Sequence, residues 1–224
     1  MELRPTAAGL VLAAALGCAA GPGARATDIT ATVTDDAGRP VRDAVVVAVP
    51  IDGVMPVPPH PRAQIVDQID KEFVPKVKAI VVGTPIMFPN HDQVRHQVYS
   101  FSPAKKFELP LYAGVPAQPV VFDKPGVVVL GCNIHDWMVG YVYVSESPWF
   151  ATTGSDGRAI IAGLPPRAYV VRVWHPQLDG SEDATHQTID VDSGHPVGIV
   201  WKLTLRPEVR VRRAPAANHN GQHY

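Results

Sequence analysis

The chain has 224 residues, of which 18% are charged, and a formal net charge of −1 with histidine neutral. This length allows one large or two small domains, so a sizeable core can form without disulfide bonds. The balanced charge argues against a polyanion as partner, because nucleic-acid-binding proteins usually carry a strongly basic patch or stripe. We therefore expect no nucleic-acid partner.

Residues 1–26 have the layout of a secretory signal peptide. Arg4 precedes an apolar stretch at 7–15, and a small-x-small site ends at Ala26. The stretch is too short to span a bilayer, which takes about 20 residues, and no later segment is a better candidate. We expect an exported protein, periplasmic or secreted, that has no transmembrane segment and begins near Thr27 when mature.

A lipid anchor at Cys18 is the less favoured alternative, because Ala15 stands where an acylation motif usually has Leu, Val or Ile. Cleavage of the signal peptide removes Cys18 and leaves Cys132 as the only thiol of the mature chain. Thiols in oxidising compartments usually pair in disulfides. The unpaired Cys132 therefore needs another role.

From residue 27 onward the sequence consists of short runs rich in Val, Ile and Thr, separated by prolines and by turn residues such as Asp156-Gly157. This pattern predicts β-strands and no amphipathic helix of useful length. Short strands at such spacing indicate a sandwich. The predicted strands are 29–34, 43–49, 77–82, 86–88, 96–100, 120–122, 127–130, 140–144, 159–161, 169–174 and 198–205.

Four side chains form a candidate metal site. Cys132, His135 and Met138 share one loop between two predicted apolar strands, where a tight turn can aim them at one point. His96, at the start of another predicted strand, is the fourth candidate ligand. Two imidazoles, a thiolate and a thioether are the donors of a trigonal copper site with a weak axial Met, whereas zinc favours further Cys or His. The sequence predicts one copper ion, cycling between Cu(I) and Cu(II).

Residues 64–147 resemble a cupredoxin domain of the plastocyanin and amicyanin kind. The Cys-x2-His-x2-Met loop at 132–138 is similar to that of amicyanin, and FPNHD at 88–92 followed by His96 resembles the loop and first His ligand of the family. The stretches HQVYSFSPAKKFELPLY and GCNIHDWMVGY also look like exported proteins of the methylamine utilisation kind.

This resemblance implies an eight-stranded Greek-key sandwich that transfers one electron at a time. It also implies that the exposed edge of His135 is the electron port and that Trp137 contributes to an apolar docking surface. His91 is the alternative to His96 as a ligand, but in the family motif its position faces solvent. Lys105 and Lys106 are candidates for docking an acidic redox partner, and a solvated hairpin without a partner is the alternative.

Two outer segments, 28–50 and 151–176, together resemble a carboxypeptidase-regulatory-like sandwich, although Arg167 stands where that family usually has Gly. The proline-dense segment 54–62 is expected to be a stiff boundary. We predict an all-β fold in which a Greek-key cupredoxin sandwich is inserted in, or fused to, a small prealbumin-like sandwich. A single enlarged sandwich is the alternative. The assignment is a signal peptide at 1–26, the regulatory-like sandwich at 27–53 and 148–206, the cupredoxin domain at 54–147 and a disordered tail at 207–224.

The leading functional prediction is a type 1 blue copper protein that carries single electrons between redox partner proteins. The alternative is a periplasmic module that binds or delivers copper without a dedicated role in electron transfer. An enzyme would need a second copper site, and the chain has no His-x-His pair to build one, so we expect no catalysis. At His175 a second metal site has no support, and we expect a surface or hydrogen-bonded histidine. The tail residues His219 and His223 are weak candidates for copper binding, and a disordered tail is the alternative.

Overall fold

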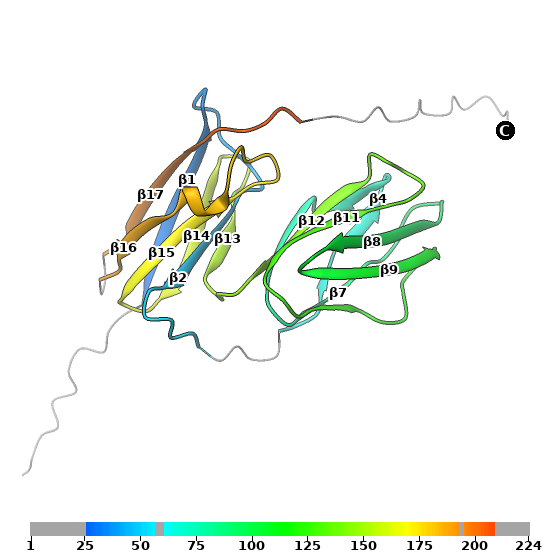
Figure 1. Cartoon of the computed structure of the whole chain (residues 1–224), viewed down its shortest axis with the longest axis horizontal. Coiled ribbons are helices and arrows are strands. Elements are labelled where there is room, and N and C mark those ends of the chain that lie inside the picture. The colour runs from blue at the N-terminus through cyan, green and yellow to red at the C-terminus, as the bar shows by residue number, and fades with distance from the viewer. Residues whose placement is uncertain (1–25, 57–60, 193–194, 209–224) are drawn as a thin grey trace, which may run out of the picture.

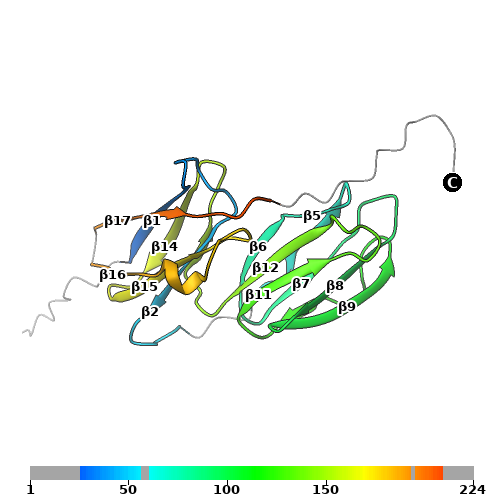
Figure 2. The ribbon, with the colours of Figure 1, turned by 45° about the horizontal axis from the view of Figure 1, so that its top comes forward.

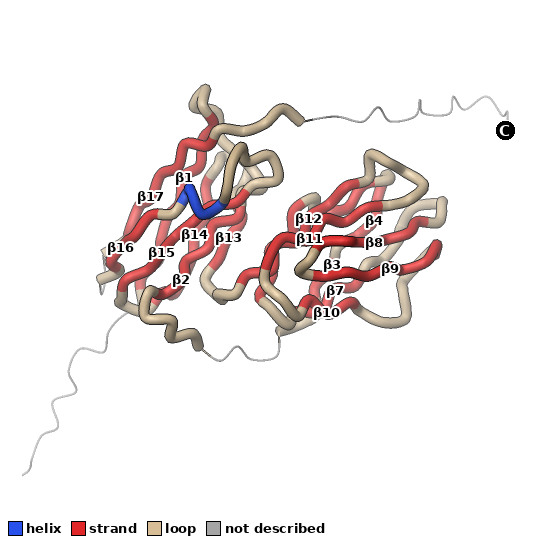
Figure 3. The backbone as a smooth tube through the Cα atoms, in the orientation of Figure 1, coloured by secondary structure: helices blue, strands red, loops and turns tan. Residues whose placement is uncertain are grey.

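The structure is a computed structural model that describes residues 26–56, 61–192 and 195–208. These residues form seventeen strands and a single 3₁₀ turn, η1 (Glu182–Thr185), and they contain no α-helix (Figures 1 and 3). The prediction of an all-β fold is confirmed. No helix among these residues is long and apolar enough to cross a membrane.

The first sandwich is built from both ends of the described chain. Its strands are β1 (Thr27–Asp35), β2 (Val45–Pro50), β13 (Phe150–Thr152), β14 (Arg158–Leu164), β15 (Ala168–Trp174), β16 (Gln187–Asp190) and β17 (Val197–Leu203). They pair in the orders β14-β1-β17 and β13-β2-β15-β16. In β1 every second residue is buried, so Ile29, Ala31 and Val33 enter a core that also contains Tyr169 and Trp201.

The second sandwich lies between β2 and β13 in the sequence. A five-stranded sheet of order β6-β12-β11-β8-β9 faces a three-stranded sheet of order β10-β7-β3 and the two-stranded hairpin β4-β5. Its core includes Phe88, Phe122, Leu130 and Val142. The strands are β3 (Gln64–Ile65), β4 (Asp67–Ile69), β5 (Glu72–Val74), β6 (Val77–Val81), β7 (Thr84–Met87), β8 (His96–Ser102), β9 (Lys105–Tyr112), β10 (Val120–Phe122), β11 (Gly126–Gly131) and β12 (Val139–Ser145).

A third apolar cluster joins the two sandwiches. Val45 and Val47 of β2 are fully buried against Val77 of β6 and Tyr143 of β12. Trp174 of β15 completes the cluster, with its ring centroid 5.6 Å from that of Tyr143. Figure 2 shows β6 and β12 on the side of the second sandwich that faces the first. The outer face of the five-stranded sheet is therefore partly covered by the first sandwich.

Every predicted strand corresponds to an observed strand, and six short or polar strands were not predicted. The longest of these is β9, whose sequence KKFELPLY contains Lys105, Lys106 and Pro110. Proline cannot donate a ladder hydrogen bond, so it is tolerated on an edge strand, and β9 lies at the edge of its sheet. The other five are β3, β4, β5, β13 and β16.

Several predictions concern residues outside the described ranges. They are the signal peptide apart from Ala26, the prolines at 58–59, and the tail beyond residue 208 with His219 and His223. The last described residues contact both sandwiches. The Arg206 N–H donates to the Gln177 carbonyl over 2.8 Å. Glu208 forms an ion pair with Lys76 of the second sandwich at 2.5 Å. The assignment of residues 27–206 to named domain families stays a prediction.

Candidate metal centre

The loop that follows β11 places Cys132 in the core. Side chains of β11 alternate, so Val128, Leu130 and then Cys132 point inward, and Cys132 is only 3% exposed. The loop closes with two hydrogen bonds, from the Met138 N–H to the His135 carbonyl (2.9 Å) and from the Val139 N–H to the Trp137 carbonyl (3.1 Å). This tight turn returns the chain to the core, where Met138 is 1% exposed.

His96 comes from the neighbouring strand. In β8, His96, Val98 and Ser100 are buried while the residues between them are not, and His96 is fully buried. Strand β8 pairs with β11 through Tyr99 and Gly131, the residue that precedes Cys132. This pairing explains how residues 36 positions apart in the sequence meet at one point.

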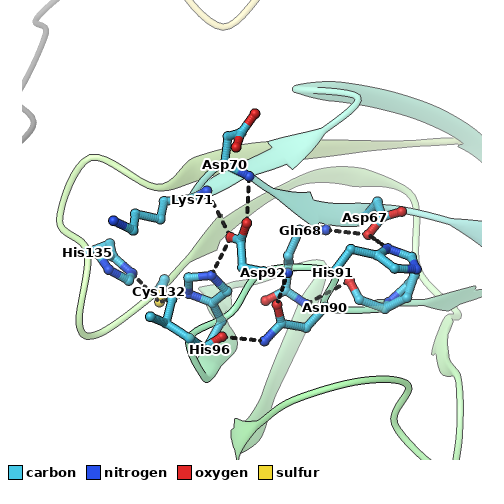
Figure 4. A network of polar contacts seen from close by, with 12 residues as sticks. Asp67, Gln68, Asp70, Lys71, Asn90, His91, Asp92, His96, Cys132 and His135 are labelled. Atoms are coloured by element: carbon cyan, nitrogen blue, oxygen red, sulfur yellow. Dashed lines mark hydrogen bonds and ion pairs between the residues drawn. The ribbon is translucent and has the colours of Figure 1, made fainter. Parts of the chain in front are cut away.

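The three donor atoms have a separation suited to a single metal ion. The Cys132 Sγ lies 3.8 Å from Nδ1 of His96 and 3.9 Å from Nδ1 of His135 (Figure 4). The three candidate ligand atoms all lie within 4.8 Å of one another. For an ion in a trigonal plane, bonds of about 2.0 Å to nitrogen and about 2.3 Å to sulfur place these atoms about 3.7 Å apart. The residues present therefore fit one ion.

Asp92 fixes the orientation of His96. The Nε2 of His96 lies 2.7 Å from the Asp92 carboxylate, which leaves Nδ1 facing the thiol. Burial acts to raise the pKa of Asp92, but hydrogen bonds from the Lys71 N–H, the His96 ring and the Asp70 N–H outweigh it and the pKa is lowered. Histidines that ligate metals commonly donate their second N–H to a carboxylate in this way.

His135 is the least buried of the three candidate ligands, and the pKa of its ring is lowered. Burial lowers its pKa, and the positive charges of His96 and Lys71 lower it further against the opposing effect of Asp92. A neutral imidazole keeps a nitrogen lone pair for a metal at physiological pH. Its neighbours are Trp137, at a ring-centroid distance of 5.1 Å, and Ile134, which is 49% exposed.

Two other candidate histidines lie apart from this group. The side chain of His91 is 61% exposed, and its Nδ1 lies 2.6 Å from the Asp67 carboxylate. His175 is 8% exposed in the first sandwich, where its Nδ1 accepts a hydrogen bond from the Gln177 N–H over 3.2 Å. Both therefore have protein partners in place of a metal.

The remaining predicted residues lie as follows. Met138 is buried and belongs to the same core cluster as Cys132; its role as a ligand stays a prediction. Lys105 pairs with Asp123 at 3.0 Å, while Lys106 is exposed on β9 opposite Phe101.

Two features of the site were not predicted, namely Asp92 and the β4-β5 hairpin that contacts it. The Asp-x3-His spacing from Asp92 to His96 is a sequence signal that could have indicated the role of Asp92. The hairpin has three-residue strands and no glycine in its turn, so it carries little sequence signal.

Neither a protein-family model nor a curated protein matches this chain. Parts of it are similar to solved copper proteins. A purple cupredoxin from Nitrosopumilus maritimus is 28% identical over 38% of this chain and 99% of its own, with a TM-score of 0.33. An oxidised amicyanin variant is 22% identical over 37% of this chain and 82% of its own, with a TM-score of 0.34.

A copper-containing nitrite reductase from Thermus scotoductus is 28% identical over 52% of this chain, with a TM-score of 0.35. The matched region spans only 28% of the reductase. Because these TM-scores are low, the function proposed below rests on the geometry and donor chemistry of His96, Cys132 and His135.

Proposed function

We propose that this protein is an exported type 1 copper protein that carries single electrons and holds one copper ion with His96, Cys132, His135 and Met138. The observation that carries the proposal is a buried, unpaired thiol with an imidazole Nδ1 at 3.8 Å on one side and another at 3.9 Å. Two imidazoles and one thiolate in a trigonal arrangement are the donors that copper electron-transfer sites use.

The donor set favours copper over zinc. A structural zinc site takes four Cys or His ligands, whereas the group found among the described residues has three. The same loop carries Met138, whose thioether is a weak and soft ligand that suits copper. A metal-bound thiolate also gives Cys132 a reason to remain unpaired in an exported protein.

When bound, copper supplies a one-electron couple, Cu(II) to Cu(I), with the electron coming from one partner protein and passing to another. The protein's contribution is to hold the donors in place. His96 is fixed by Asp92, and Cys132 is fixed by the packing of β11. A rigid site need not rearrange when the charge of the metal changes. His135 is the most accessible ligand, so we place the electron port there, with Trp137 and Ile134 in the docking surface for a redox partner.

Addition of Cu(II) to the purified protein tests the proposal. We expect an intense thiolate-to-copper charge-transfer band in the visible spectrum, and its loss in Cys132→Ser and His135→Gln. His91→Gln is the matched control, because His91 is exposed and bonded to Asp67, so this variant should keep the band. The absence of a band in the unaltered protein would refute the copper assignment.

Voltammetry of the copper-loaded protein separates an electron carrier from a copper-delivery module. A carrier gives a reversible one-electron wave and keeps its metal in the presence of a competing chelator. The complete burial of His96 and the near-complete burial of Met138 favour retention of the metal. Rapid loss of copper in both oxidation states would instead support delivery.

A further inference from the structure

The β4-β5 hairpin reaches the metal site through its turn. Asp70 and Lys71 connect the two strands and both have positive φ, 54° and 60°. Their backbone N–H groups donate to the two oxygens of the Asp92 carboxylate over 2.7 and 2.8 Å. The same carboxylate lies 2.7 Å from Nε2 of His96. The turn therefore contacts His96, a predicted metal ligand, through the carboxylate of Asp92.

The side chain of Lys71 approaches the other histidine. Figure 4 shows it extending from the turn toward the His135 ring. Its ammonium group is one of the charges that act on that ring, after burial and the charge of His96. Lys71 is exposed, so the charge stands at the accessible side of the site.

The choice of residues in the turn supports a role for this side chain. A two-residue turn with positive φ at both positions favours Asn-Gly or Asp-Gly, because glycine adopts this conformation without steric cost. Lys71 occupies the second position at φ 60° although glycine would fit there. The hydrogen bond to Asp92 uses only the backbone, so it gives no reason for a lysine.

We propose that the β4-β5 hairpin tunes the metal site in two ways: its turn positions Asp92 and through it His96, and the Lys71 ammonium stabilises the reduced ion. The inference rests on the proposed copper function. A nearby positive charge opposes the state with the larger positive charge, so it favours Cu(I) over Cu(II) and raises the reduction potential. Lys71 supplies no ligand atom. Its backbone N–H helps to position Asp92, and its charge acts on the reduction potential of the metal.

Reduction potentials of copper-loaded variants test the charge. Lys71→Gln should lower the potential by an amount equal to about a threefold to tenfold change in the redox equilibrium constant, where tenfold is 59 mV for one electron. Lys71→Gly should do the same without loss of stability, because it keeps the N–H donor and suits the positive φ. The difference from the unaltered protein should shrink at high salt, since the charge is exposed.

Lys124→Gln is the matched control. Lys124 is an exposed lysine that precedes β11, whereas the metal ligand Cys132 follows the other end of that strand, so its removal should leave the potential unchanged. Equal potentials in the unaltered protein and both Lys71 variants would overturn the role of the charge. Absence of the charge-transfer band in the unaltered protein would instead refute the copper function itself, so the two failures are distinguishable.

Amide hydrogen exchange tests the positioning role. The N–H groups of Asp70 and Lys71 should be protected in the unaltered protein and exchange faster in Asp92→Ala, together with a shift of the charge-transfer band. Asp67→Ala is the control, because this carboxylate of the same hairpin contacts His91 and not His96. Unprotected amides in the unaltered protein, or an unshifted band in Asp92→Ala, would overturn the role of the turn.

Discussion

At the scale of single residues, the site combines one unusual thiol with two differently held imidazoles. His96 is fully buried and bonded to a carboxylate, whereas His135 is only partly buried and has no such partner among the described contacts of its ring. The first ring is therefore fixed, and the second can face a partner. Asp92 supports the site by orienting the buried His96 ring.

Asp92→Asn should weaken copper binding about 10-fold to 100-fold, because an outer carboxylate orients its histidine and increases the basicity of the ring. Competition with a chelator of known affinity measures the effect. Asp67→Asn is the control and should bind copper normally. Equal affinities for the two variants would show that Asp92 does not support the site.

The pH dependence of stability should include a contribution from His175. Burial lowers the pKa of this ring below 6.5, so below pH 6.5 the unfolded chain binds a proton that the folded chain does not. The free energy of unfolding should therefore fall as the pH drops below about 6.5. Urea unfolding at a series of pH values measures this. A fall of the same size in His175→Gln would contradict the assignment.

At the scale of elements, the contact between β8 and β11 determines whether the ligands meet. Gly131 lies under the ring of Tyr99, and a Cβ on this glycine would be 2.7 Å from the ring. The close approach brings His96 of β8 beside the thiol that follows β11. A glycine before Cys132 is therefore required by packing.

Gly131→Ala should destabilise the protein by about 1 to 3 kcal/mol, because the added methyl group must displace the Tyr99 ring or the strand. Chemical denaturation measures the loss, and the charge-transfer band should shift in the same variant. Gly198→Ala in β17 is the control, since a Cβ there meets nothing within 4 Å. Equal stabilities of the two variants would exclude the proposed close packing.

At the scale of the whole molecule, the first sandwich covers part of the second sandwich. The first sandwich contributes the apolar side chains of Val45, Val47 and Trp174 to this contact. A polar network lies next to it, where the Tyr143 hydroxyl donates to Glu182. Arg172 pairs with Glu146 and, at 2.7 Å, with Glu182. Burial of this kind makes the two sandwiches energetically dependent on each other.

Trp174→Ala should therefore lower stability by about 2 to 3 kcal/mol and separate the thermal unfolding of the two sandwiches. Scanning calorimetry reports both effects. Phe101→Ala is the control, because Phe101 is 75% exposed and should contribute little. An unchanged transition in Trp174→Ala would argue that the sandwiches are independent.

Much of this organisation could be predicted from the sequence. Alternating Val and Ile residues predicted the principal strands, because strand periodicity is a local property. The candidate ligands His96, Cys132 and His135 were also predicted from their chemistry, and the fold brings their donor atoms within 4.8 Å of one another. The β4-β5 hairpin and the hydrogen bonds from its turn to Asp92 could not be predicted, since they depend on which backbone N–H groups meet a carboxylate in three dimensions. Edge strand β9 was missed because its lysines and proline weaken the strand pattern.

The most direct test of the central claim is the visible spectrum of the full chain with one equivalent of Cu(II), compared with that of Cys132→Ser. We predict an intense thiolate charge-transfer band in the unaltered protein and none in the variant. A band that survives in Cys132→Ser, or one that never forms in the unaltered protein, would contradict the assignment of His96, Cys132 and His135 as a copper site.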